Sequence, residues 1–140
     1  AANQKTPKAI GIGLEYDEGL SHLLEAGADM FLMPSRFEPC GLNQMYSLRY
    51  GTPPIARKTG GLADSIVHSS PATVANHTAN GFLFKSADAT SLLASIDDAL
   101  RLYRESDIWQ NIIKTGMAVD NSWLHSARQY EDIYRRVVET

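Results

Sequence analysis

The chain has 140 residues, of which 44% are hydrophobic and 21% are charged, and its formal net charge is -3 at pH 7. This length suffices for one globular domain that buries roughly 70% of its unfolded surface on folding. The mild negative charge argues against a nucleic-acid surface, because contacts with a phosphate backbone need a basic patch. No apolar stretch approaches the ~18 residues of a membrane span, and we expect no signal peptide. A single cysteine cannot form an internal disulfide, which favours a reducing, cytoplasmic setting.

Short apolar runs alternate with segments of helical spacing along the chain. This pattern predicts a strand at residues 8–13, a helix at 19–26, a strand at 29–33, a helix at 42–50, a strand at 53–57, a helix opened by Gly60 and Gly61, a strand at 81–84, and helices at 89–104, 107–117 and 124–138. The prolines that lead the third strand mark either its first residues or an edge of the sheet.

The remaining segments carry more specific expectations. We expect residues 68–80 to form a flexible loop, and Ser106 and Ser122 to cap the last two helices. Trp109 and Trp123 are expected to hold the C-terminal helices on the sheet. The final helix should turn its apolar side inward, with Ala127, Tyr130, Ile133, Tyr134 and Val137.

Alternating strands and helices predict an α/β fold, a partial Rossmann-like parallel sheet with helices on both faces. Four strands are few for an open doubly wound sheet. We therefore interpret residues 1–140 as one domain that is incomplete at its N-terminus.

Two loops between a strand and a helix stand out. The first, PSRFEPCGL at residues 34–42, places the Glu38 carboxylate and the Cys40 thiol at the carboxyl end of a strand, where open α/β sheets bind ligands. The second is Thr59-Gly60-Gly61, and glycines there would let a ligand approach the backbone N–H groups closely. Neither loop has the GxxxxGK[ST] or GxGxxG pattern, which disfavours ATP hydrolysis and NAD binding. Together the loops favour a nucleotide or sugar site.

These loops, with YGTPP at residues 50–54 and TGGLAD at 59–64, resemble the C-terminal domain of bacterial glycogen synthases and plant starch synthases. The similarity extends from Tyr16 to Trp123. It implies the C-terminal half of a GT-B fold and a retaining glucosyltransferase, which transfers glucose from ADP-glucose to the non-reducing end of an α-1,4-glucan. The implied partners are the nucleotide sugar and the glucan, with no cofactor and no metal. A plant starch synthase would be located in the plastid.

The resemblance also implies roles for individual residues. Glu38 matches the glutamate that contacts the donor glucose and stabilises positive charge at the anomeric carbon, a role that suits a carboxylate. Tyr16 falls where an aromatic ring stacks on adenine. The remaining donor-site positions are Cys40 as a pocket wall, Gly41 and Leu42 as backbone donors, Asn43 where threonine is common, and Thr59, Gly60 and Gly61 as the second loop of the pocket.

The chain also departs from the broader GT-B pattern. Tyr46 stands where many of those families have a second glutamate, which binds ribose, and Asn121 stands where phenylalanine is common. Arg36 and Arg57 are expected to form ion pairs at strand ends. The N-terminal domain that supplies the cations for the departing diphosphate has no counterpart here, so we expect the chain alone to be inactive.

Two other functions stay open. The chain could belong to a related GT-B enzyme that uses UDP-glucose, because a tyrosine can stack on either base. It could also be a non-catalytic module that binds nucleotide or glucan.

Overall fold

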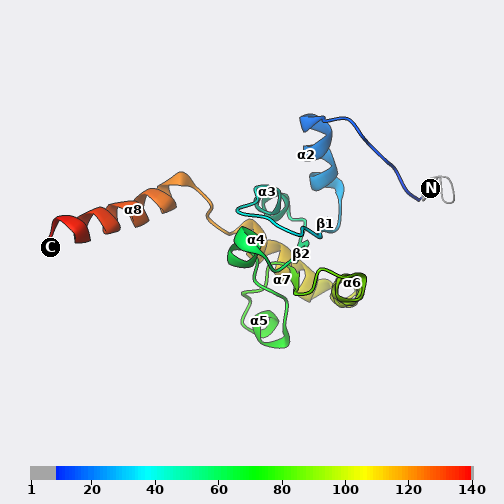
Figure 1. The fold of residues 1–140 in the computed structure, drawn as a ribbon. Coiled ribbons are helices and arrows are strands. Elements are labelled where there is room, and N and C mark those ends of the chain that lie inside the picture. The colour runs from blue at the N-terminus through cyan, green and yellow to red at the C-terminus, as the bar shows by residue number, and fades with distance from the viewer. Residues whose placement is uncertain (1–8, 140) are drawn as a thin grey trace.

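The computed structural model describes residues 9–139 (Figure 1). In chain order its elements are α2 (Glu18–Gly27), β1 (Phe31–Met33), α3 (Asn43–Tyr50), β2 (Pro54–Arg57), α4 (Gly60–Ser65), α5 (Pro71–Ala75), β3 (Phe82–Phe84), α6 (Ala89–Tyr103), α7 (Ser106–Met117) and α8 (Trp123–Val138). The strands form a parallel sheet in the order β1-β2-β3, so the α/β class is confirmed.

Helices cover both faces of this sheet, as predicted. Successive residues of a strand point to opposite faces, and β2 contributes Ile55 to one apolar cluster and Ala56 to the other. The larger cluster is built with α6 and α7, whose Leu102, Trp109 and Ile112 are buried with Ile55. The smaller cluster is covered by α4 through Leu62. The core therefore consists of two apolar layers around a short central strand.

The central position of β2 decides between the two interpretations of its prolines. Pro54 is the first residue of β2 and pairs with Phe31 of β1, whose N–H donates to the carbonyl oxygen of Pro53. The prolines thus mark the start of the strand and not an edge. A proline is tolerated at this place because the first residue of a strand can lack an N–H donor.

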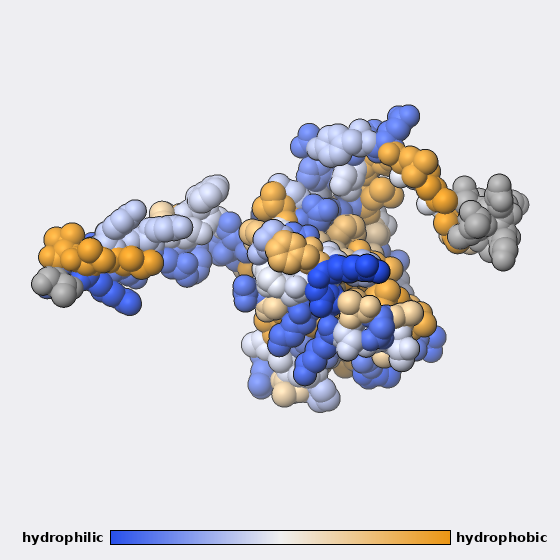
Figure 2. Space-filling view, viewed as in Figure 1, coloured by the Kyte–Doolittle hydropathy of each residue, from blue (hydrophilic) through white to orange (hydrophobic). Residues whose placement is uncertain are grey.

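The predicted first strand is wrong. Among the described residues, 9–13 form no strand, and Ile10 and Ile12 are exposed; Lys8 lies outside the described range. Figure 1 shows this segment running away from the sheet, and Figure 2 shows its apolar atoms on the surface. An apolar run becomes a strand only where a neighbouring strand offers its N–H and C=O groups, and none does here. The sheet therefore has three described strands, not four.

The segment at residues 68–80, predicted to be a flexible loop, is ordered by hydrogen bonds. It contains α5, which begins with a reciprocal capping box: the Thr73 N–H donates to Ser70 Oγ at 3.2 Å, and the Ser70 N–H donates to Thr73 Oγ1 at 2.8 Å. Asn80 is buried, and its side-chain oxygen accepts from the Val67 N–H at 2.7 Å. Polar side chains of this segment therefore satisfy its backbone groups.

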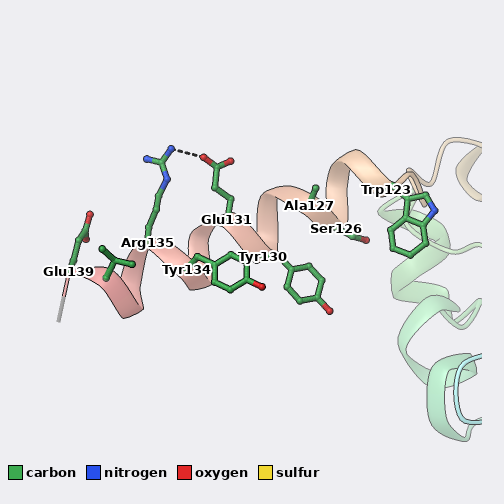
Figure 3. Close-up of a pocket in the computed structure, with 9 residues that line it drawn as sticks. Trp123, Ser126, Ala127, Tyr130, Glu131, Tyr134, Arg135 and Glu139 are labelled. Atoms are coloured by element: carbon green, nitrogen blue, oxygen red, sulfur yellow. Dashed lines mark hydrogen bonds and ion pairs between the residues drawn. The ribbon is translucent and has the colours of Figure 1, made fainter.

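The last helix forms as predicted, but its apolar side is not covered by the described part of the chain. α8 projects from the body (Figure 1), and Tyr130 and Tyr134 extend from one side of it, away from the Glu131–Arg135 ion pair (Figure 3). All of the residues predicted to face inward are exposed, namely Ala127, Tyr130, Ile133, Tyr134 and Val137. Helical periodicity identifies an apolar face, but it does not identify the surface that covers the face.

The two tryptophans behave differently. Trp109 is only 5% exposed and stacks on Phe82 of β3 with ring centroids 6.1 Å apart, so its predicted role is confirmed. Trp123 is 88% exposed and does not hold α8 on the sheet. The caps also differ: Ser122 occupies the predicted N-cap position of α8, but its side chain makes no capping hydrogen bond. Glu105 precedes α7, and Ser106 is already helical.

The two loops at the carboxyl edge of the sheet pack backbone against backbone. The N–H of Gly61 donates to the carbonyl oxygen of Pro39 at 3.2 Å. A Cβ atom on Gly60 would lie 1.9 Å from the Glu38 carbonyl oxygen, and one on Gly61 would lie 2.0 Å from the Cys40 carbonyl oxygen. Gly60 also has a φ of +44°, which disfavours other residues. Only glycines allow this approach.

We therefore expect Gly61→Ala to destabilise the chain by about 1–3 kcal/mol, the usual cost of forcing an extra methyl group into a packed site. Urea denaturation followed by circular dichroism would measure the loss. Gly27→Ala is the matched control, because a Cβ atom added there would have no neighbouring atom within 4 Å; it should change stability by less than ~1 kcal/mol. Equal unfolding midpoints for the two variants would contradict the proposed close packing.

Candidate functional site

The loop after β1 is tied to the end of β2 by Arg57. Its Nε donates to the Ser35 carbonyl oxygen at 2.7 Å, and its guanidinium also donates to the carbonyl oxygen of Arg36. The predicted ion pair of Arg57 is therefore wrong: the charge satisfies backbone carbonyls of the loop instead of a carboxylate. This places the loop that carries Glu38 at the carboxyl end of the sheet, as the sequence predicted.

A buried glutamine joins the two loops, and sequence reasoning missed it. Gln44, in the first turn of α3, has Nε2 within 3.1 Å of the Cys40 carbonyl oxygen, 3.0 Å of that of Gly41 and 3.2 Å of Ser65 Oγ. Ser65 Oγ in turn donates to the Gly61 carbonyl oxygen at 2.6 Å. The sequence does contain a signal for this role. Gln44 is the second residue of a helix that directly follows a loop, and a polar side chain there can reach back to the carbonyl groups of the loop.

The structure thus brings together six of the predicted site residues. Glu38 and Cys40 of the first loop lie against Gly60 and Gly61 of the second, and Gly41 and Thr59 are their neighbours in the chain. Cys40 is exposed and makes no disulfide, and Glu38 is half-buried. A carboxylate and a thiol therefore lie beside a packed pair of loops at the carboxyl edge of a parallel sheet, the usual ligand-binding edge of this fold class.

The three other predicted residues lie around a neighbouring hollow. Tyr16, Leu42 and Asn43 line a space of about 940 Å³ between α2, the segment before it and the start of α3. Tyr16 is 92% exposed, so its ring is free to stack on a ligand. We call this space the Tyr16 hollow. Its volume is within the ~300–1,000 Å³ of ordinary small-molecule sites.

Contacts between α2 and α3 form one wall of the Tyr16 hollow. His22 of α2 packs edge-on against Tyr46 and Tyr50 of α3, with ring centroids 5.5 and 5.8 Å away, and its Nδ1 lies 3.3 Å from the Tyr50 hydroxyl. Thr52 fixes the end of α2, because its hydroxyl donates to the Glu25 carbonyl oxygen at 2.5 Å. Desolvation raises the pKa of the buried Glu25 carboxyl, an effect that His22 partly opposes.

Two kinds of feature are absent from residues 9–139. Their His, Cys, Asp and Glu side chains form no group of three or more that could hold a metal ion. None of their helices is both long and apolar enough to cross a membrane.

Comparison with known proteins agrees with this geometry. Residues 7–115 match the family described as glycosyl transferases group 1. The chain is 52% identical to glycogen synthase 1 of Methylococcus capsulatus over 94% of its length, and 49% identical to the glycogen synthase of Dechloromonas aromatica over 98%. It spans only 27% and 28% of those two relatives.

Solved structures show the same relationship. The catalytic domain of starch synthase IV from Arabidopsis thaliana, bound to ADP and acarbose, superposes on 99% of this chain with a TM-score of 0.85 and 40% identity, and the match covers 29% of that structure. A sucrose-phosphate synthase from Thermosynechococcus elongatus shares the fold, with a TM-score of 0.64 and 23% identity over 99% of this chain and 33% of its own. The family match spans most of the chain and includes both packed loops, so the chain belongs to the group 1 glycosyl transferases.

Proposed function

We propose that the chain is the donor-binding part of a glycogen or starch synthase, which transfers glucose from ADP-glucose to the non-reducing end of an α-1,4-glucan with retention. The observation that carries the proposal is the 40% identity and close superposition with a starch synthase domain that was solved with ADP. The Tyr16 hollow and the packed loops supply an arrangement that suits such a ligand.

In this proposal Glu38 is the catalytic residue. Its carboxylate would contact the donor glucose and stabilise the positive charge that develops at the anomeric carbon as the diphosphate departs. Its position on a loop held by Arg57 and by the Gly61 N–H suits that role, because electrostatic stabilisation requires a fixed charge. Cys40 would form a wall of the glucose pocket and would not act as a nucleophile.

The remaining residues would bind the donor. The ring of Tyr16 would stack on adenine, and the backbone N–H groups of Gly41 and Leu42 would donate to the glucose and its phosphate. Asn43 lines the Tyr16 hollow at the N-terminus of α3, where the helix dipole favours an anion. The second loop, Thr59, Gly60 and Gly61, would shape the pocket by holding the first.

The chain would act as one part of a longer enzyme that also contacts the glucan. It spans less than a third of the length of those two relatives, and the family resemblance assigns the cations for the departing diphosphate to an upstream part of the enzyme. We propose that the chain alone binds donor without transferring glucose, and that the whole enzyme works in the cytoplasm.

We expect the chain to bind ADP, and Tyr16→Ala to weaken that binding about tenfold, because base–aromatic stacking contributes ~1–3 kcal/mol per base. Isothermal titration with ADP and, separately, with UDP would measure both. Tyr103→Ala, which removes a tyrosine on α6 outside the Tyr16 hollow, is the control. Unchanged ADP affinity in Tyr16→Ala would reject the stacking role, and equal affinity for UDP would reject the preference for adenine.

The catalytic role of Glu38 is best tested in a chimera in which this chain replaces the matching segment of the Methylococcus glycogen synthase 1. We expect Glu38→Gln to lower kcat by ~100–1,000-fold with little change in KM, because the lost charge acts on the transition state. The measurement is transfer of radiolabelled glucose to glycogen. Glu105→Gln, an exposed carboxylate next to α7, should leave kcat unchanged. Equal losses in kcat and in donor affinity would make Glu38 a binding residue only.

A further inference from the structure

A second hollow borders α3 and is lined by no residue of α2. It has a volume of about 670 Å³ and lies between α3 and the segment that joins α7 to α8. Tyr46 and Arg49 line it from α3, and Asp120, Asn121 and Trp123 line it from the joining segment. We call it the linker groove. Arg49 holds its two walls together, since its guanidinium donates to the Met117 carbonyl oxygen at 3.3 Å.

The side chains of the linker groove suit a sugar. Trp123 is 88% exposed and Tyr46 is 44% exposed, so both rings offer flat apolar faces to a ligand. Asp120 and Asn121 place a carboxylate and an amide beside these rings. A pyranose ring has an apolar C–H face that packs on an aromatic ring and a rim of hydroxyl groups that hydrogen-bond to carboxylates and amides.

The charges of the linker groove favour a neutral ligand over a phosphorylated one. Hydrogen bonds from Ser122 lower the pKa of the Asp120 carboxyl, and the nearby His125 and Arg128 act in the same direction, so this carboxyl is ionised at neutral pH. The cation on the opposite wall, Arg49, already donates to a backbone carbonyl. The two charged residues that line the groove, Arg49 and Asp120, have opposite signs, so the lining offers no net positive charge to a phosphate.

The linker groove adjoins the proposed donor site. Leu42 and Tyr46 line both the Tyr16 hollow and the linker groove, so one exposed edge of α3 separates the two spaces. A ligand in the groove would therefore lie next to a nucleotide sugar in the Tyr16 hollow. The groove does not include Glu38.

We propose that the linker groove binds a segment of the acceptor α-1,4-glucan, with Trp123 and Tyr46 stacked on glucose rings and Asp120 and Asn121 bonded to hydroxyl groups. The inference rests on the proposed function, because the choice of an α-1,4-glucan among neutral saccharides comes from the proposed reaction. It adds a binding surface for the acceptor that is separate from the reacting centre.

The test is an NMR titration of the chain with maltoheptaose. Intrinsic fluorescence gives a second signal, which reports on Trp123 because the other tryptophan, Trp109, is buried. We expect Trp123→Ala to weaken maltoheptaose binding at least tenfold and Asn121→Ala about threefold. Both side chains are exposed, so the thermal unfolding midpoints of the variants should match that of the unmodified chain.

Tyr134→Ala is the matched control. Tyr134 is an exposed aromatic residue on α8 that lines a different hollow, which Trp123 also borders (Figure 3). Its removal should leave maltoheptaose affinity unchanged. A loss as large as that in Trp123→Ala would place the glucan on α8 and overturn the proposal, as would undetectable binding or equal binding by Trp123→Ala.

Titration with ADP separates this proposal from the donor site. A chain that binds ADP but not maltoheptaose rejects the linker groove alone. A chain that binds maltoheptaose through Trp123 but does not bind ADP supports the groove and rejects the donor site. Cellohexaose, with β-1,4 linkages, should bind more weakly than maltoheptaose, and equal binding would reject an α-glucan site.

Discussion

The direct contact between the backbones of residues 38–40 and 60–61 is the constraint on which the rest of this edge of the molecule depends. The Gly61 N–H reaches the Pro39 carbonyl oxygen at 3.2 Å, and a Cβ on either glycine would collide with a carbonyl oxygen of the first loop. Because β1 and β2 are neighbours in the sheet, their carboxyl ends lie side by side. Gly60 and Gly61 have no side chains, so the two loops can approach each other closely. Arg57 and Gln44 then hold the loops from either side through carbonyl groups.

This arrangement keeps the backbone of the loop fixed while the Cys40 side chain is exposed and the Glu38 side chain is half-buried. Glu38 and Cys40 lie on a loop whose carbonyls are occupied by Gly61, Gln44 and Arg57, so their side chains remain available to a ligand. A catalytic charge must be held in place before the reaction, since reorganisation during the reaction would cost part of its effect. The loop that carries Glu38 is held by hydrogen bonds to its backbone carbonyl groups, and these bonds do not use the side chains of Glu38 and Cys40.

Most of the fold could be predicted from local patterns, and the errors came from what those patterns do not contain. Strand β2, the helices α3 and α6 and the glycine-led α4 follow from apolar runs and from glycine positions. The segment at 9–13 has a strand-like composition but no partner among the described strands, and α8 has an amphipathic pattern but no covering surface among the described residues. Both errors concern contacts between distant segments. The sequence likewise favoured one ligand site for the two loops, but it did not indicate that Gln44 would join them, because its bond to Ser65 depends on how α3 is oriented.

The orientation of α3 connects the two proposed binding spaces. Its buried side, Gln44, Ser47 and Leu48, fixes the helix against the sheet and the loops. Its exposed side carries Tyr46, which the Tyr16 hollow and the linker groove share. Buried polar residues hold one side of α3, and Tyr46 is exposed on the other side. In this position the helix can keep the proposed donor and acceptor sites adjacent without covering them. Gln44, one of these buried residues, also bonds to the loop that carries Glu38, so the geometry of the two spaces and that of Glu38 are linked through one side chain.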